Sequence, residues 1–117
     1  MQPYLFPLCV LAAFLGWRWV SSVRSRRAIA GLRGERALVI DVRSPLEFSS
    51  GHVSGSLNIP LARLADAPLD VDRGSWLIVC CASGTRSAVA KGILRRRGFA
   101  KVINGGSWGN VDRALAT

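Results

Sequence analysis

The chain has 117 residues, enough for one folded domain, so a membrane-spanning segment would subtract directly from its core. Half of the residues are hydrophobic and 20% are charged, a composition typical of a globular domain. Sixteen Lys and Arg against seven Asp and Glu leave a net charge of +9. These values exclude two domains of ordinary size within the 117 residues, and the location of the basic excess becomes informative.

The first predicted element is an apolar helix. Residues 3–17 carry no charge, and Arg18-Trp19-Val20 can extend this run because a guanidinium can snorkel to lipid headgroups. A bilayer-spanning helix needs about 17 to 25 residues, so we predict a transmembrane anchor over residues 1–22. A cleaved signal peptide is the alternative, but the run has no basic region before it and no small-residue cleavage site after it. A buried core helix is a further alternative, although so small a chain offers little interior to cover it.

The residues at the two ends of this helix predict its orientation. Tyr4, Trp17 and Trp19 flank the apolar run as an interfacial aromatic belt would, and the arginines follow it. Lys and Arg are enriched in cytoplasmic segments next to transmembrane helices. We therefore predict a single-pass protein of the cell membrane whose domain lies in the cytoplasm.

Residues 23–36 are predicted to form a basic juxtamembrane segment with a short lead-in helix, ended by Gly31 and Gly34. From position 18 to position 36, the chain carries one acid, Glu35, and the arginines Arg18, Arg24, Arg26, Arg27, Arg33 and Arg36. Such a cluster can bind nucleic acid or anionic lipid, or only face solvent. The preceding apolar helix favours membrane lipid, and we expect no nucleic-acid partner.

Residues 37–117 are predicted to form an α/β domain. Residues 37–42 and 76–81 are continuously apolar and rich in β-branched side chains, which is typical of strands covered on both faces. Residues 101–104 are a third, shorter candidate strand. Helical segments between these strands predict an open parallel sheet flanked by helices, which binds ligands at the carboxyl ends of its strands.

Two helices are predicted between the strands. Ser44 to Glu47 has the pattern of a capping box, with proline at the first helical position. Residues 87–99 carry an apolar stripe at helical spacing, and Gly98 supplies the C-terminal stop. The second helix follows directly on a loop of small residues.

The three cysteines are Cys9 in the apolar helix and the adjacent pair Cys80 and Cys81. This spacing suits neither a disulfide between distant segments nor a C-x-x-C metal pair. The sequence therefore favours a reducing compartment and a reactive thiol. Cys81 is the better candidate, because it ends a predicted strand at the ligand-binding edge.

A thiol is a good nucleophile only as a thiolate, so its ordinary pKa of about 8.5 must fall. Backbone N–H groups of the small-residue loop 82–85 can surround an anion. The following helix directs its positive dipole end to the same place, and Arg86 adds a full charge. Adjacent strand residues face opposite sides, so only Cys80 or Cys81 can face this loop. A buried cysteine is otherwise most often an inert hydrophobe, which we expect of Cys80.

Residues 38–64 and 77–110 together resemble the single-domain rhodaneses, which are sulfurtransferases. The first stretch matches the D-V-R, E-F, G-H-I and N-I-P pattern of that family through Asp41, Val42, Arg43, Glu47, Phe48, Gly51, His52, Asn58, Ile59 and Pro60. The second matches the C-x-S-G-x-R-S loop and the closing G-G and Trp through Cys81, Ser83, Gly84, Arg86, Ser87, Gly105, Gly106 and Trp108. The resemblance covers residues 37–111.

This resemblance implies that Cys81 takes a sulfane sulfur from a donor, holds it as a persulfide and passes it to a thiophilic acceptor. The backbone amides of the loop and the Arg86 guanidinium would stabilise the anionic sulfur. The implied binding residues are Ala82, Ser83, Gly84, Thr85 and Arg86. The donor would be thiosulfate or a persulfide, and the acceptor a thiol, a cyanide-like nucleophile or a protein. No metal or organic cofactor is implied, and two successive displacements predict ping-pong kinetics.

Two other functions stay open at this stage. Counted from Cys80, the loop has the longer spacing of cysteine-based phosphatases and arsenate reductases, whereas counted from Cys81 it has the length found in sulfurtransferases. The Ser-Gly pair that follows favours Cys81. A non-catalytic, membrane-tethered binding module is the other alternative. Many rhodaneses carry a charged residue after the cysteine, but Ala82 is neutral, which leaves the use of thiosulfate open.

Four further residues are expected to have structural roles. His52 is expected to make a structural hydrogen bond in its turn rather than to act as a base. Asp41 and Arg43, at a strand end, are expected to brace neighbouring loops. Trp108 is expected to pack against the domain rather than to line the substrate pocket.

Overall fold

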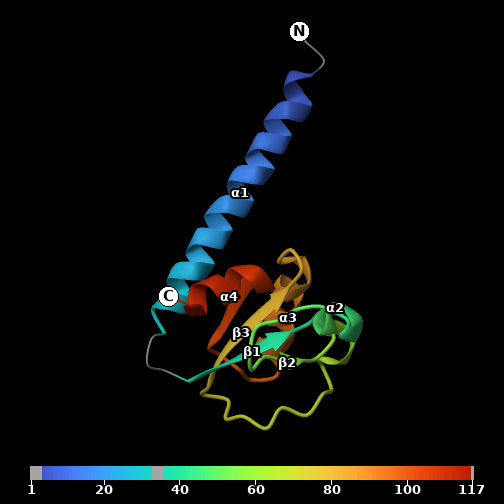
Figure 1. The fold of residues 1–117 in the computed structure, drawn as a ribbon, viewed down its shortest axis with the longest axis vertical. Helices are drawn as coiled ribbons and strands as arrows, with labels where there is room; N and C mark the ends of the chain where they lie inside the picture. Colours follow the sequence, from blue (N-terminus) through green and yellow to red (C-terminus); the bar gives the residue numbers. More distant parts are fainter. Residues whose placement is uncertain (1–3, 33–35, 117) are drawn as a thin grey trace.

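The computed structural model describes residues 4–32 and 36–116, in which a long helix stands away from a small α/β domain (Figure 1). The helices are α1 (Leu5–Ala30), α2 (Pro45–Ser49), α3 (Thr85–Arg96) and α4 (Trp108–Ala116), with a 3-10 turn at Leu61–Arg63. The strands are β1 (Ala37–Asp41), β2 (Leu57–Asn58), β3 (Trp76–Cys81) and β4 (Val102–Ser107).

The four strands form one parallel sheet in the order β2-β1-β3-β4. The central strands β1 and β3 are the two continuously apolar runs, which confirms the predicted open parallel sheet flanked by helices. The two-residue strand β2 was not predicted, because it is too short to show a pattern. Strand β4 is longer than expected and continues through Gly105 and Gly106 to Ser107, with a register shift opposite Val79 and Cys80.

Each face of the sheet carries its own apolar cluster, because successive residues of a strand face opposite sides. Leu77, Val79 and Cys81 of β3 belong to the cluster under α3, and Ile78 and Cys80 belong to the other. The second cluster lies under α4 and the last part of α1. The two adjacent cysteines therefore face opposite sides of the sheet, as predicted.

Helix α1 continues without a break into the domain. The predicted boundary between an anchor at residues 1–22 and a separate lead-in helix within 23–36 is not seen, because no glycine or proline interrupts residues 17–30. The helix ends at Ala30, so the predicted stop at Gly31 is confirmed, whereas Gly34 lies outside the described residues. Ile29 is buried in the core, and Ser25 Oγ donates a hydrogen bond of 2.8 Å to the Asn104 carbonyl of β4.

The first part of α1 is exposed throughout. Residues 4–20 make no buried contact with the domain, and the helix has a mean hydropathy of 1.4 over its most apolar window. None of that window is buried, which argues against a soluble core helix. By length and composition, α1 can cross a membrane.

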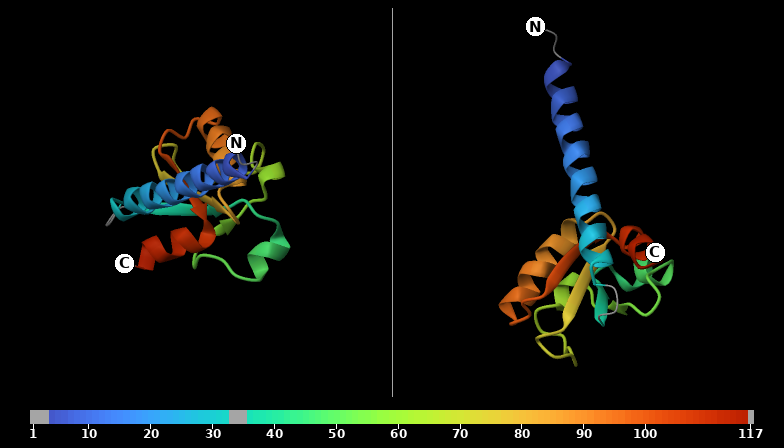
Figure 2. Two further views of the ribbon diagram at one scale, coloured as in Figure 1. Left: turned by 90° about the horizontal axis from the view of Figure 1, so that it is seen from above. Right: turned by 90° about the vertical axis from the view of Figure 1, so that its left-hand side faces the viewer.

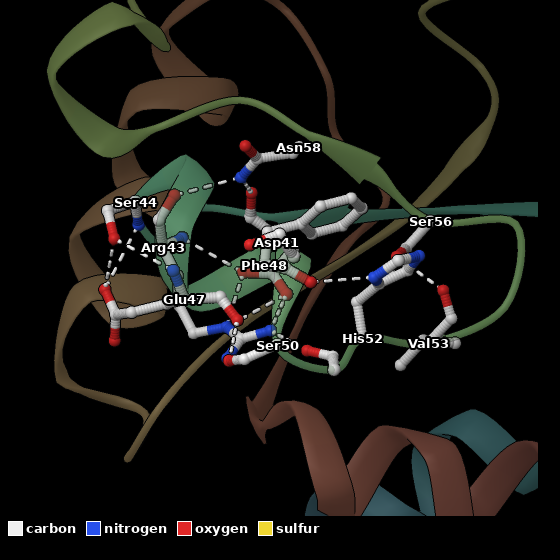
Figure 3. A network of polar contacts seen from close by, with 12 residues as sticks. Asp41, Arg43, Ser44, Glu47, Phe48, Ser50, His52, Val53, Ser56 and Asn58 are labelled. Carbon is white, nitrogen blue, oxygen red and sulfur yellow. Dashed lines mark hydrogen bonds and ion pairs between the residues drawn. The ribbon is translucent and has the colours of Figure 1, made fainter.

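A buried ion pair closes the carboxyl end of β1 (Figure 3). Arg43 Nη2 lies 2.8 Å from Asp41 Oδ2, and both side chains are almost completely buried. The same nitrogen donates to the Gly51 carbonyl at 2.6 Å, and the Asn58 amide donates to the carbonyls of Asp41 and Arg43. The prediction that Asp41 and Arg43 brace neighbouring loops is confirmed.

We expect Asp41→Ala to destabilise the fold severely, because Arg43 would keep a buried charge without its carboxylate. Breaking one partner of a buried pair costs about 3 to 5 kcal/mol of unfolding free energy. Urea unfolding of the full chain in detergent micelles measures this loss. Asp70→Ala, at an exposed loop position, is the matched control and should change little. Equal stabilities of the two variants would contradict the bracing role.

Candidate active site

The loop after β3 surrounds the sulfur of Cys81. Cys81 is the last residue of the strand and is fully buried, and α3 begins at Thr85. Gly84 between them has a φ of 100°, a left-handed conformation that glycine adopts without strain. This turn directs the Gly84 N–H to the sulfur, at 2.9 Å from Cys81 Sγ. The predicted anion-binding loop thus has at least one amide on the predicted nucleophile.

Ser87, in the first turn of α3, is the side chain that links the sulfur to the rest of the domain. Its hydroxyl lies 3.5 Å from Cys81 Sγ and 2.6 Å from Asn104 Oδ1 on β4. The Gly106 N–H also donates to Asn104 Oδ1, at 3.0 Å, which fixes the orientation of this amide because only its oxygen can accept. Asn104 therefore holds Ser87 in place against the sulfur.

The surroundings of Cys81 favour its thiolate. Burial would raise the pKa of the thiol, but the contact with the Ser87 side chain and the hydrogen bonds from the amides of Ser87, Ser83 and Gly84 outweigh this effect. The net effect lowers the pKa of Cys81 below its ordinary value. A buried sulfur that is stabilised as an anion can act as a nucleophile near neutral pH.

Cys80 has the opposite environment. Burial in the second apolar cluster, with the nearby charge of Asp41, raises the pKa of Cys80 to about 12. This thiol stays protonated and inert near neutral pH. The prediction that Cys80 is a core residue is therefore confirmed, and the difference from Cys81 comes from which face of the sheet each side chain occupies.

Arg86 does not point at the sulfur in this structure. Its two terminal nitrogens donate to Oε1 and Oε2 of Glu47 at 2.8 and 3.0 Å, which makes a two-pronged ion pair between α3 and α2. This guanidinium was predicted to stabilise the anionic sulfur. That direct role stays a prediction, because the observed partner is the carboxylate of Glu47.

Glu47 is held for this contact by the capping box of α2, which confirms the motif predicted from sequence. The Ser44 N–H donates to Glu47 Oε1 at 3.1 Å, and the Glu47 N–H donates to Ser44 Oγ. The Arg86 hydrogen bonds, with that of the Ser44 amide, lower the pKa of Glu47 to about 2. The carboxylate is therefore charged at every physiological pH, so the ion pair holds the loop from outside.

The other predicted binding residues lie on the exposed side of the loop. Ala82, Ser83 and Thr85 are exposed, and Ser83 Oγ lies 3.5 Å from Thr85 Oγ1. Of the five predicted binding residues, Ser83 and Gly84 direct their amides to Cys81, whereas the Arg86 side chain binds Glu47. Ser87, Asn104 and Glu47 were not predicted as site residues, although Ser87 and Glu47 lie within the matched motifs.

His52 and Trp108 have the expected structural contacts. His52 Nδ1 lies 2.8 Å from the Phe48 carbonyl, and its ring stacks on Phe48 at a centroid distance of 3.8 Å (Figure 3). Trp108 packs against the second apolar cluster, and the Arg43 guanidinium lies 5.2 Å from the centre of its ring. The contacts of both side chains are thus with other parts of the domain and not with Cys81 Sγ.

The fold and the loop define a cysteine-centred α/β domain, in which the pKa of Cys81 is lowered at the carboxyl edge of a parallel sheet. The family model of the Rhodanese-like domain matches residues 26–108. This chain therefore belongs to the rhodanese-like family of sulfurtransferases. The matched residues include the last turns of α1, which the structure also joins to the domain.

Similarity to known proteins supports membership of this family. The uncharacterized protein YqhL of Bacillus subtilis is 32% identical over 118 aligned residues, which cover 92% of this chain and 94% of that protein. The thiosulfate sulfurtransferase GlpE of Ectopseudomonas mendocina is 38% identical, over 62% of this chain and 67% of that protein. A solved structure described as a rhodanese with anions from E. coli has a TM-score of 0.60 and 34% identity, over 64% of this chain and 91% of that one.

We expect Ser87→Ala to slow the alkylation of Cys81. The Ser87 hydroxyl donates to Asn104 Oδ1 in this structure and lies 3.5 Å from the sulfur, so it can turn its proton to Cys81 when the thiol ionises, and the variant loses that hydrogen bond. A hydrogen bond to a charged group contributes about 1.5 kcal/mol, so the rate constant with iodoacetamide at pH 7 should fall about tenfold. Mass spectrometry of the modified peptides follows Cys81 separately from Cys9 and Cys80. Ser83→Ala, which keeps its backbone amide, is the matched control. An unchanged rate in the Ser87 variant would contradict the assigned role.

Proposed function

We propose that this protein transfers sulfane sulfur through a persulfide on Cys81. The observation that carries the proposal is the state of its sulfur, which is buried and yet receives the Gly84 N–H at 2.9 Å. The lowered pKa of this thiol supports a nucleophile that starts its reaction as a thiolate. Membership of the rhodanese-like family supports the same chemistry.

In the first displacement, the Cys81 thiolate attacks the outer sulfur of the donor. A new S–S bond forms, the bond between the outer sulfur and the rest of the donor breaks, and the leaving group departs with the bonding electron pair. With thiosulfate the leaving group is sulfite, and with a persulfide it is a thiolate. No proton has to be removed from Cys81, because it reacts in its ionised form.

In the second displacement, a nucleophilic acceptor attacks the outer sulfur of the persulfide. The acceptor keeps that sulfur, and the electron pair of the broken S–S bond returns to Cys81 as the thiolate. With cyanide the product is thiocyanate, and with a thiolate it is a new persulfide. Amides of residues 83, 84 and 87 stabilise the negative charge at Cys81, so the loop favours both the start and the end of the cycle.

We also infer that α1 anchors the domain at the cytoplasmic side of the cell membrane. The support is the exposed apolar helix of residues 4–20, with Arg18 near its end, and the arginines that follow it, Arg24, Arg26 and Arg27. Contact of these guanidinium groups with anionic headgroups would add to the binding. The proposed anchor is joined directly to the domain, because α1 continues into its core.

We expect the full chain in detergent to convert thiosulfate and cyanide, or thiosulfate and a dithiol, with ping-pong kinetics. Cys81→Ser should abolish turnover and the mass increase of one sulfur on the protein, because the carrier is lost. Cys80→Ser is the matched control and should keep most of the activity. Activity lost only in the Cys80 variant would contradict the assignment. Hydrolysis of a phosphate ester in place of sulfur transfer would favour the phosphatase alternative. The absence of both reactions would favour a binding module.

We expect a C-terminal tag on the full chain to resist protease added to intact cells and to be removed in inside-out membrane vesicles. The reason is the excess of arginine after α1, which retains the domain in the cytoplasm. Immunoblotting of the tag measures both reactions, and a periplasmic or external marker protein controls for protease activity. Loss of the tag from intact cells would reverse the proposed topology.

A further inference from the structure

We propose that the catalytic edge of the domain lies against the anionic headgroup layer of the membrane that α1 spans, so that Cys81 exchanges sulfur at the membrane surface. This inference rests on the proposed anchor and on the proposed sulfur transfer. It adds the direction in which the site faces. Three features of the structure carry it: the direction of α1, the absence of a spacer and the character of the exposed loop.

The first feature is the direction of α1 relative to the site. Figures 1 and 2 show the connection between β3 and α3 at the end of the domain from which α1 departs. The long connection before β3 lies at the opposite end in both figures. Helix α1 is held in this direction by its contacts with β4 and α4, which include the Ser25 hydrogen bond to Asn104. The catalytic edge and the apolar half of α1 therefore lie toward the same side.

The second feature is that nothing separates the membrane-crossing part of α1 from the domain. The exposed residues 4–20 extend about 25 Å at 1.5 Å per residue, whereas the hydrocarbon core of a bilayer is about 30 Å thick. From Ser21 onward the helix is partly buried, and Ser25 binds β4 directly. The whole exposed helix is needed to cross the bilayer, so the near end of the domain lies in the headgroup layer.

The third feature is the character of the surface at this end. The exposed residues of the loop, Ala82, Ser83 and Thr85, are small and uncharged, so they can approach headgroups without burying a charge. On α1, Arg24 and Arg27 are exposed beside the domain and suit anionic lipid. The positive charges that attract anionic headgroups thus lie on the helix, and the exposed side chains of Ala82, Ser83 and Thr85 add no charge.

This arrangement restricts what can reach the sulfur. A small anion or a thiol carried at the membrane surface can enter between the loop and the headgroups. A bulky sulfur carrier that approaches from bulk solvent is blocked, because the domain and the bilayer leave no room for it at the loop. We therefore infer that Cys81 is reached along the membrane surface.

The first test measures the depth of two positions. A fluorescent label is attached at Thr85→Cys, next to the site, or at Asp70→Cys, in the connection before β3, in the full chain with Cys9→Ser, Cys80→Ala and Cys81→Ser. The protein is placed in vesicles of phosphatidylcholine and phosphatidylglycerol that contain lipids with a nitroxide on the headgroup. We expect the label at position 85 to lose most of its fluorescence and the label at position 70 to lose little. Equal quenching, or stronger quenching at position 70, would overturn the proposal.

The second test moves the domain away from the bilayer. Eighteen helical residues inserted between Val20 and Ser21 add about 27 Å and five complete turns, so the domain keeps its rotation about the helix axis. Quenching at position 85 should then disappear. In the chain with Cys9→Ser and Cys80→Ala, labelling of Cys81 by a polyethylene glycol maleimide should rise severalfold, while labelling by N-ethylmaleimide stays the same. Equal polymer labelling with and without the insertion would overturn the proposal.

These tests separate the proposal from the functions on which it rests. The labelled proteins for the depth test lack Cys81, so their result does not depend on sulfur transfer. Alkaline carbonate extraction of the same vesicles tests the anchor alone. Protein that remains with the lipid but shows equal quenching at both positions would refute only the direction of the site. Protein removed by carbonate would overturn the anchor and this proposal together.

Discussion

The hydrogen bonds between the loop after β3 and the sulfur of Cys81 are the interaction on which the rest of the site depends. A buried thiol would normally resist ionisation, and Cys80 shows this, since burial and the charge of Asp41 raise its pKa to about 12. At Cys81, the Ser87 side chain and three backbone amides reverse the effect of burial. Two adjacent residues of the same type thus differ in chemistry because the loop reaches only one of them.

Those hydrogen bonds require a loop that is held in one conformation. Inside the domain, Asn104 Oδ1 accepts hydrogen bonds from the Ser87 hydroxyl and from the Gly106 amide. Outside, Arg86 joins the start of α3 to Glu47 on α2, and the capping box fixes Glu47 in turn. The buried pair of Asp41 and Arg43 supports the neighbouring loops at the same edge. Side chains from four elements therefore act together to position one sulfur atom.

Helix α1 contributes to the fold as well as to the proposed anchor. Its last turns close one face of the sheet through Ile29, and Ser25 binds the carbonyl of Asn104, the residue whose side chain holds Ser87. A helix that is part of the core cannot swing freely about a linker. With α1 as the proposed anchor, this packing would set the position of the domain relative to the membrane and the direction of the catalytic edge.

The sequence by itself determined the class of fold, and it predicted the anion-binding loop and Cys81 as the nucleophile. Apolar runs, a capping box and small residues before a helix are local patterns that have the same meaning wherever they occur. It could not determine the partner of Arg86, the contact of Ser87 with Asn104 or the continuity of α1 into the domain. The first two contacts join residues 39 and 17 positions apart in the chain. The third requires knowing that α1 packs against α4 and β4 over one face of the sheet. Only the tertiary structure brings those groups together, because long-range contacts depend on how the elements pack and leave no local pattern in the sequence.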